Sequence, residues 1–241
     1  GEIRIGVYGN EDPMYILAGL PFIAPDYATA WLLKDLAKGY IDNAFKEKGL
    51  KILYYTPWPG QGFYTKFPVN STSDFKGKKL RIYSTATQKM GQMLGFNATI
   101  LPFAEIPQAF STGLIEALFT SPQTGIDIQA WDNTKHFTYA GAIFSKNAVV
   151  VGEKYFSALS ANDQSNMLAA AARAELRGWE MSAATTVAQM AILKKNGMTV
   201  VNAPDSVITK MKEIGKEMMA GWRKDASPEA IAVLDRYLAL Q

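Results

Sequence analysis

The chain has 241 residues, of which 48% are hydrophobic and 20% are charged, so it can bury a core and does not have a disordered composition. Its net charge of +3, without any run of five like charges, argues against a nucleic-acid partner. The absence of cysteine and the single histidine, His136, exclude disulfides and thiolate chemistry and make a zinc site unexpected. We therefore expect no metal and no cofactor.

The first 55 residues alternate between strand and helix patterns. The apolar alternation IRIGVYG at 3–9 predicts a strand. An amphipathic helix is predicted to follow, with Asp26 as N-cap and Gly49 as its stop, and KILYY at 51–55 predicts a second strand. Because the chain opens with a strand already under way, two interpretations stand: a signal was removed together with more chain, or this is a fragment.

The stretch TPWPGQGFYTKFP at 56–68 is rich in proline, glycine and aromatic residues, which predicts a crossing loop. It carries four aromatic residues: Trp58, Phe63, Tyr64 and Phe67. These side chains either pack against a lobe or form an aromatic wall for a ligand.

Two consecutive strand–helix–strand units are predicted next, which favours a parallel sheet. In the first strand Leu80 and Ile82 point to one face, and Arg81 and Tyr83 to the other. The following helix is predicted to begin near Thr85 or Thr87. The remaining segments of the two units are the strand 97–103, the helix 104–113 and the strand 115–121.

A long helix dominates the last third of the sequence. After a strand at 148–151, no helix breaker other than Gly178 interrupts 161–196, a length of about 54 Å as a helix. A helix of that length would extend along more than one lobe. A strand at 198–201 follows, then two helices that open at Asp205 and at the Ser227-Pro228 pair.

Arg81 is the strongest candidate for a binding residue. It lies near a strand-to-helix turn, and ligands of open α/β sheets bind beyond the carboxyl ends of strands. Its planar guanidinium matches a carboxylate, and such a charge-assisted hydrogen bond contributes roughly 1.5–3 kcal/mol. The alternative interpretation is a structural arginine that is salt-bridged to a nearby Asp or Glu.

Motifs for catalysis are missing: there is no nucleophile elbow, no P-loop and no dinucleotide fingerprint. An enzyme would have only Ser84, Thr85 and Tyr83 as nucleophile or acid candidates. The ligand-sensing half of a regulator is a further alternative, but it would need a DNA-binding segment, and the sequence shows none.

The segment FKGKKLRIYSTATQKMGQMLGFNATILPFAEIPQAFSTGLIEALFTSP, residues 75–122, resembles the central signature of the DctP-type solute receptors of TRAP transporters. The stretches LAGLPFIAPDYATAWLL and VVVGEKYFSALSANDQ resemble further parts of that family more loosely. The positions that match the signature are Asp74, Lys76, Gly77, Lys79, Arg81, Leu94, Gly95, Phe103, Glu105, Ala109, Gly113 and Glu116.

This resemblance implies a periplasmic receptor rather than an enzyme, with an α/β fold of the class II periplasmic-binding-protein kind. Two lobes enclose a ligand cleft, and a long helix passes behind both. We expect lobe I to comprise 1–61 and 147–185, and lobe II to comprise 62–146 and 186–241. The implied partners are a small organic acid, the subunits of a TRAP membrane permease, and a second chain that supplies an N-terminal part of on the order of 60 residues.

The resemblance also implies individual site residues. Arg81 matches the family's carboxylate-gripping arginine, Phe103 its cleft aromatic, and Thr120 falls near a frequent asparagine. Where the family often has a second arginine this chain has Tyr64, and Leu118 and Phe119 replace polar residues. These departures favour a monocarboxylate with an apolar or aromatic body. The full set of expected ligand-binding residues is Arg81, Phe103, Thr120, Tyr64, Phe63, Tyr83, Trp58, Phe119, Phe144 and Asn10.

Overall fold

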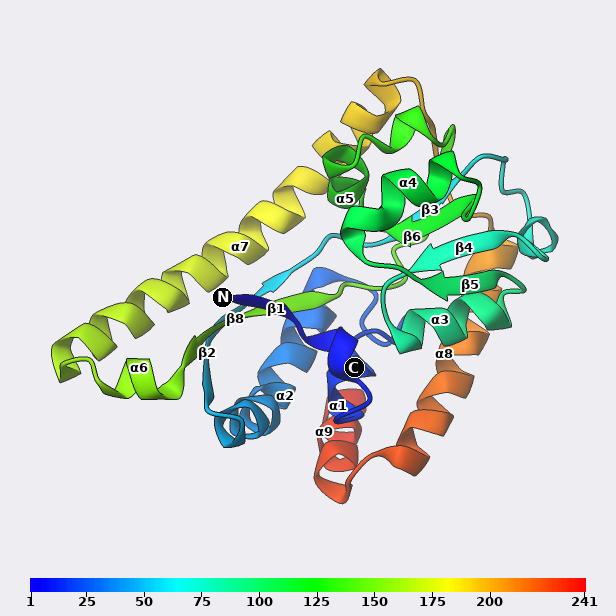
Figure 1. The fold of residues 1–241 in the computed structure, drawn as a ribbon. Helices are drawn as coiled ribbons and strands as arrows, with labels where there is room; N and C mark the ends of the chain where they lie inside the picture. Colours follow the sequence, from blue (N-terminus) through cyan, green and yellow to red (C-terminus); the bar gives the residue numbers. More distant parts are fainter.

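Two β-sheets and one long helix organise the chain in the computed structural model, which describes residues 1–241 (Figure 1). The strands are β1 (Glu2–Arg4), β2 (Leu50–Pro57), β3 (Gly62–Thr65), β4 (Lys79–Ile82), β5 (Asn97–Ile100), β6 (Ala117–Thr120), β7 (His136–Tyr139), β8 (Lys146–Gly152) and β9 (Thr199–Asn202). The helices are α1 (Met14–Leu17), α2 (Tyr27–Glu47), α3 (Thr85–Met93), α4 (Ile106–Ser111), α5 (Pro122–Asp127), α6 (Glu153–Ser157), α7 (Ala161–Lys195), α8 (Asp205–Asp225) and α9 (Pro228–Ala239).

The smaller sheet has three antiparallel strands in the order β1-β8-β2. Strand β1 is shorter than the apolar alternation predicted. It runs antiparallel to β8, and Arg4 already pairs with Asn147 near the start of β8, so the residues after Arg4 have no partner there. Residues Ile5–Tyr8 instead form a 3₁₀ turn. This turn directs the chain from the edge of the sheet towards α1.

The larger sheet is mixed, with the order β5-β4-β6-β3-β7-β9. The predicted parallel units are confirmed, because β4 pairs in parallel with both β5 and β6. The expected loop at 56–68 is partly wrong: residues 58–61 and 66–68 lie outside the strands, but β2 runs through Pro57, and β3 pairs antiparallel with β6 and β7. Gly62 permits this tight insertion, since a Cβ there would lie 2.4 Å from the Thr138 carbonyl oxygen.

Most helix ends follow the sequence signals. Asp26 caps α2 through its carboxylate, which accepts a hydrogen bond from the Thr29 amide at 2.8 Å, and Gly49 adopts a positive φ of 73° after the helix. Helix α3 begins at Thr85, one of the two predicted starts. Ser84 is the N-cap, and its hydroxyl accepts from the Thr87 amide.

Helix α7 connects the two sheets from one side (Figure 1). Its 35 residues correspond to about 52 Å, close to the length predicted from the sequence. It packs on β2 of the smaller sheet, where Glu175 and Trp179 bond to Tyr55, and on α5 and β9 of the part that holds the larger sheet. The helix therefore forms a common support behind both sheets.

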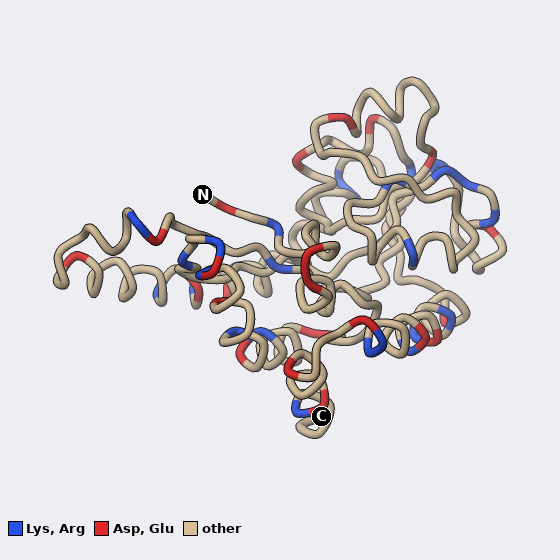
Figure 2. The backbone as a smooth tube through the Cα atoms, turned by 60° about the horizontal axis from the view of Figure 1, so that its bottom comes forward, with Lys and Arg blue, Asp and Glu red and all other residues tan.

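The C-terminal helices return from the larger sheet to the smaller one: α8 packs on α3, and α9 packs on α2 (Figure 1). Acidic and basic residues are interspersed over the molecule and leave no large face of one sign, in line with the small net charge (Figure 2). None of the helices combines the length and the apolar character that crossing a membrane requires.

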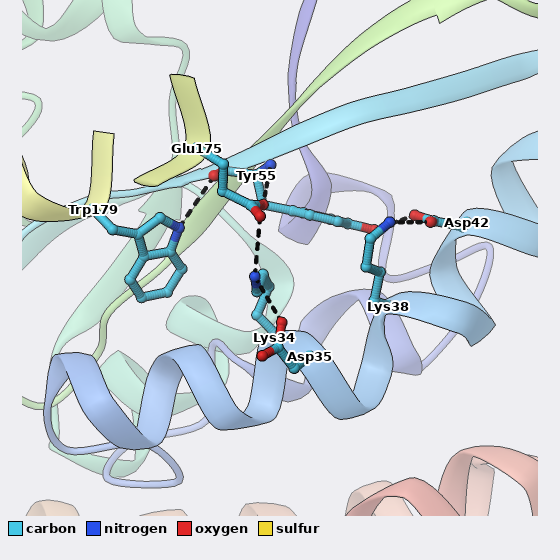
Figure 3. A network of polar contacts seen from close by, with 7 residues as sticks. All are labelled: Lys34, Asp35, Lys38, Asp42, Tyr55, Glu175 and Trp179. Carbon is cyan, nitrogen blue, oxygen red and sulfur yellow. Dashed lines mark hydrogen bonds and ion pairs between the residues drawn. The ribbon is translucent and has the colours of Figure 1, made fainter. Parts of the chain in front are cut away.

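A polar network fixes α7 to α2 and β2 (Figure 3). The Glu175 carboxylate of α7 accepts from the Lys34 ammonium at 3.2 Å and from the Tyr55 amide at 2.9 Å. The Trp179 indole donates to the Tyr55 carbonyl at 3.1 Å. This network holds one helix to a strand edge and to a second helix at the same point.

Lys34 is the buried centre of that network. Its side chain is 2% exposed, its ammonium lies 2.7 Å from the Asp35 carboxylate, and it sits 3.5 Å from the centroid of the Trp31 ring. A buried ammonium requires such partners, because an uncompensated charge in the interior is costly. The network therefore depends on both the cation and its carboxylates.

We expect Lys34→Ala to lower the free energy of unfolding by about 3 kcal/mol, because the substitution leaves the Glu175 carboxylate without its cation. Chemical denaturation measures the loss. The control is Lys210→Ala, which removes an exposed pair with Glu213 and should change stability by less than about 0.5 kcal/mol. Equal effects of the two substitutions would contradict the assigned role of Lys34.

Candidate functional site

A cavity of about 690 Å³ lies between the two sheets. It opens beyond the carboxyl ends of β4 and β6, where ligands of α/β sheets commonly bind. The smaller sheet contributes residues from β1 and from the start of β8. The lining residues are Glu2, Arg4, Val7, Trp58, Gln61, Arg81, Tyr83, Phe103, Thr120, Ser121, Thr124, Asp127, Ser145 and Asn147.

The structure brings five of the ten expected site residues together at this cavity: Arg81, Tyr83, Trp58, Phe103 and Thr120. Arg81 and Tyr83 share one face of β4 and its extension, as the period-2 alternation predicted. Phe103 follows β5, and Thr120 ends β6, so both lie at the same edge of the larger sheet.

Three expected residues are core residues instead: Phe63, Tyr64 and Phe119 are fully buried outside the cavity lining. Phe63 and Tyr64 lie on the central strand β3, both of whose faces are covered, so adjacent side chains enter two different hydrophobic clusters. Phe119 packs on Phe63 at 4.9 Å between ring centroids. The Tyr64 hydroxyl donates to the Ser121 carbonyl at 3.1 Å.

Phe144 and Asn10 also lie outside the cavity lining. The Phe144 ring packs edge-on against Tyr27, with 4.9 Å between the centroids. Asn10 is exposed in the turn that precedes α1. The expected aromatic wall is thus reduced to Trp58, Tyr83 and Phe103.

Sequence reasoning missed the polar residues that complete the lining. Glu2 and Arg4 are two apart on β1 and so share one face, a period-2 signal that was present in the sequence. Ser121 is the N-cap of α5, and its hydroxyl accepts from the Thr124 amide at 3.2 Å. Asn147 stands at the start of β8.

Arg81 is a buried cation without a carboxylate partner. Its side chain is 1% exposed, its Nε donates to the Leu101 carbonyl at 3.0 Å, and its Nη2 has no hydrogen-bond partner. No Asp or Glu lies within 4.0 Å of the guanidinium, so the alternative of a salt-bridged arginine is wrong. Burial, followed by repulsion from Arg4, lowers the pKa of Arg81 to about 10, which leaves it charged at neutral pH.

Two short hydrogen-bond chains cross the cavity wall. The Tyr83 hydroxyl donates to the Gln61 amide oxygen at 2.6 Å, and the Gln61 amide nitrogen donates to Ser145 at 3.0 Å. Burial raises the pKa of Tyr83 to about 12, so its phenol stays protonated. These bonds hold the wall residues in place without occupying the free nitrogen of Arg81.

The second chain runs along the edge of the smaller sheet. The Trp58 indole donates to the Asn147 amide oxygen at 3.2 Å, and the Asn147 amide nitrogen donates to the Glu2 carboxylate at 2.7 Å. Asn147 keeps one further donor and acceptor position, so it can also bond to a ligand.

The geometry of a nucleophile with its base is missing at the site. The Ser84 hydroxyl is engaged with Thr87 in the α3 cap, and Ser84 is not part of the cavity lining. The arrangement is suited to holding an anion by a buried guanidinium and fixed dipoles, which is the chemistry of a binding site.

Solved structures with high similarity are solute receptors. DctP7, a Bordetella pertussis extracytoplasmic solute receptor binding pyroglutamic acid, shares 36% identity with a TM-score of 0.96, covering 98% of this chain and 79% of its own. A marine metagenome TRAP solute-binding protein specific for pyroglutamate shares 31% identity with a TM-score of 0.94, covering 99% of this chain and 79% of its own.

A curated relative is the C4-dicarboxylate-binding periplasmic protein DctP of Rhodobacter capsulatus, which is 24% identical over 237 residues. The match covers 93% of this chain and 65% of that protein, so the chain spans slightly less than two thirds of the relative's length.

A family model described as bacterial extracellular solute-binding protein, family 7, matches residues 5–225. The match confirms the resemblance seen in residues 75–122 and the expected two-lobed α/β fold. The description of this family agrees with the expectation of a receptor rather than an enzyme. The chain belongs to the DctP family of bacterial extracellular solute-binding proteins.

Proposed function

We propose that this chain is a receptor that binds a small organic monocarboxylate in the cavity between the two sheets. One observation carries the proposal: Arg81 is part of the cavity lining, is 1% exposed, has no acidic partner and keeps an Nη2 without a hydrogen-bond partner. A buried donor left unpaired is costly, and a carboxylate oxygen satisfies it with a charge-assisted bond.

The lining supports a ligand with a polar body. Only four of the fourteen lining residues are hydrophobic, whereas Phe63, Phe119 and Leu118 belong to the core. The apolar or aromatic body expected from the sequence therefore loses its basis. Pyroglutamate, a carboxylate on a ring amide, is the acid named for the two receptors of 36% and 31% identity, and we adopt it as the leading candidate.

The cavity joins two sheets that carry few direct contacts with each other, which supports a mechanism of closure around the ligand. We retain the division into 1–61 plus 147–185 and 62–146 plus 186–241 as a proposal for the two lobes. Helix α9 departs from this division, because it was assigned to lobe II but packs on α2 of lobe I. The closed receptor would then deliver its acid to a TRAP-type permease. The expected second chain finds no support in the structure.

The first test is a panel of acids measured by isothermal titration calorimetry. We expect pyroglutamate to bind more tightly than glutarate, because a second carboxylate would face the Glu2 and Asp127 side chains of the lining. The amide of pyroglutamate, which lacks the anionic charge, should bind at least about 10-fold more weakly than the acid. Tighter binding of glutarate would contradict a monocarboxylate receptor.

Arg81→Met should lower the affinity for pyroglutamate by about 100-fold, since the charge-assisted bonds of the guanidinium are lost. Arg81→Lys should retain part of the affinity, because it keeps the charge but loses the planar fork. The control is Lys79→Met on the same strand, whose exposed side chain lies outside the cavity lining. Unchanged affinity in a folded Arg81→Met protein would refute the assignment.

Affinity for pyroglutamate should vary less than about twofold between pH 6 and pH 9, because Arg81, with its pKa near 10, and the ligand carboxylate both stay charged. His136, the single histidine, lies on β7 outside the lining. Titration calorimetry across this range is the measurement. A marked loss between pH 6 and pH 8 would show that a group other than Arg81 controls binding.

A further inference from the structure

Arg4 is a second cation of the same cavity, and it comes from the other sheet. It lies on β1 of the smaller sheet, whereas Arg81 lies on β4 of the larger one. Sequence reasoning assigned no role to Arg4. Its Nε is buried and has no hydrogen-bond partner, as is true of Nη2 of Arg81. Two arginines thus line the same cavity, and each has a guanidinium nitrogen without a hydrogen-bond partner.

No carboxylate of the protein neutralises Arg4. Glu2, its neighbour on the same face of β1, lies more than 4.0 Å from it and accepts a hydrogen bond from Asn147. Asp127, the other acidic residue of the lining, accepts from Gln123 at 2.7 Å. Two like charges that share a cavity repel each other, so the pair is stabilised by an anion placed between them.

Tyr83 holds Arg4 in the cavity wall. The guanidinium carbon of Arg4 lies 4.9 Å from the centroid of the Tyr83 ring, a cation–π contact, and the Tyr83 hydroxyl is fixed by its bond to Gln61. Tyr83 directly follows the strand that carries Arg81. The contact therefore draws a cation of the smaller sheet towards the anion-binding edge of the larger sheet.

We propose that Arg4 is a ligand-binding residue that shares a single ligand carboxylate with Arg81, so that one anionic group connects the two sheets. This inference rests on the proposed function, because it concerns the same cavity and the same class of ligand. A carboxylate has two oxygens and about four acceptor positions, enough for two guanidinium groups. Ligand binding and the approach of the two sheets then depend on the same contact.

The test combines single and double variants in titration calorimetry with pyroglutamate. Arg4→Met should lower affinity by about 10- to 100-fold, and Arg4→Lys should restore part of it. The amide of pyroglutamate should show a change below about threefold with Arg4→Met, because it has no charge to lose. The control is Arg173→Met, which removes an exposed arginine on α7 that is not part of the cavity lining.

The double variant Arg4→Met/Arg81→Met decides whether the two residues hold the same group. If they share one carboxylate, the double variant should lose less affinity than the product of the two single losses. Multiplicative losses would overturn the shared contact. Thermal unfolding checks that each variant is folded. If Arg4→Met does not fold, Arg4→Lys is measured in its place.

The outcomes separate this inference from the proposed function. If Arg81→Met abolishes binding while folded Arg4→Met binds within about twofold of the unmodified protein, the receptor function stands and the role of Arg4 is refuted. If no carboxylate of the panel binds the unmodified protein, the proposed function fails, and the role of Arg4 fails with it.

Discussion

An unpaired guanidinium buried between two sheets is the feature on which the site depends. Arg81 is held by one bond to the Leu101 carbonyl and keeps a free nitrogen where its strand ends. Folding places this charge in the interior without a protein carboxylate, which costs stability unless an anion arrives. The buried, unneutralised charge therefore favours binding of an acid independently of the similarity to known receptors.

The surroundings divide into a fixed support and an open cavity. On one side, α7 is fastened to α2 and β2 through the Lys34 and Glu175 network, where every charge has a partner (Figure 3). On the other side, the cavity contains two arginines that have none. A rigid support behind both sheets and unmet charges between them are together suited to a hinged receptor, because the ligand supplies the interaction that favours closure.

Local signals predicted much of this from the sequence. Period-2 alternation placed Arg81 and Tyr83 on one face, and the caps at Asp26 and Ser227 marked helix starts that the structure confirms. The uninterrupted run after residue 160 predicted α7. The resemblance of residues 75–122 to a receptor family added the fold class, which composition alone did not determine.

What the sequence left out depends on contacts between distant segments. Phe63 and Tyr64 looked like a ligand wall, but β3 lies in the middle of a sheet, so both side chains are core residues. The period-2 spacing of Glu2 and Arg4 indicated a shared face, but nothing local shows that this face of β1 lies across a cavity from β4. The pairing of β3 with β7 was not predicted for the same reason, because the two strands are more than 70 residues apart in the sequence.

The most direct test is a crystal structure of this protein grown with pyroglutamate. We expect the ligand carboxylate within hydrogen-bond distance of Arg81 Nη2, with the two sheets closer together than in the ligand-free protein. A carboxylate bound elsewhere in the cavity, for example at the start of α5, with Arg81 still unpaired, would contradict it.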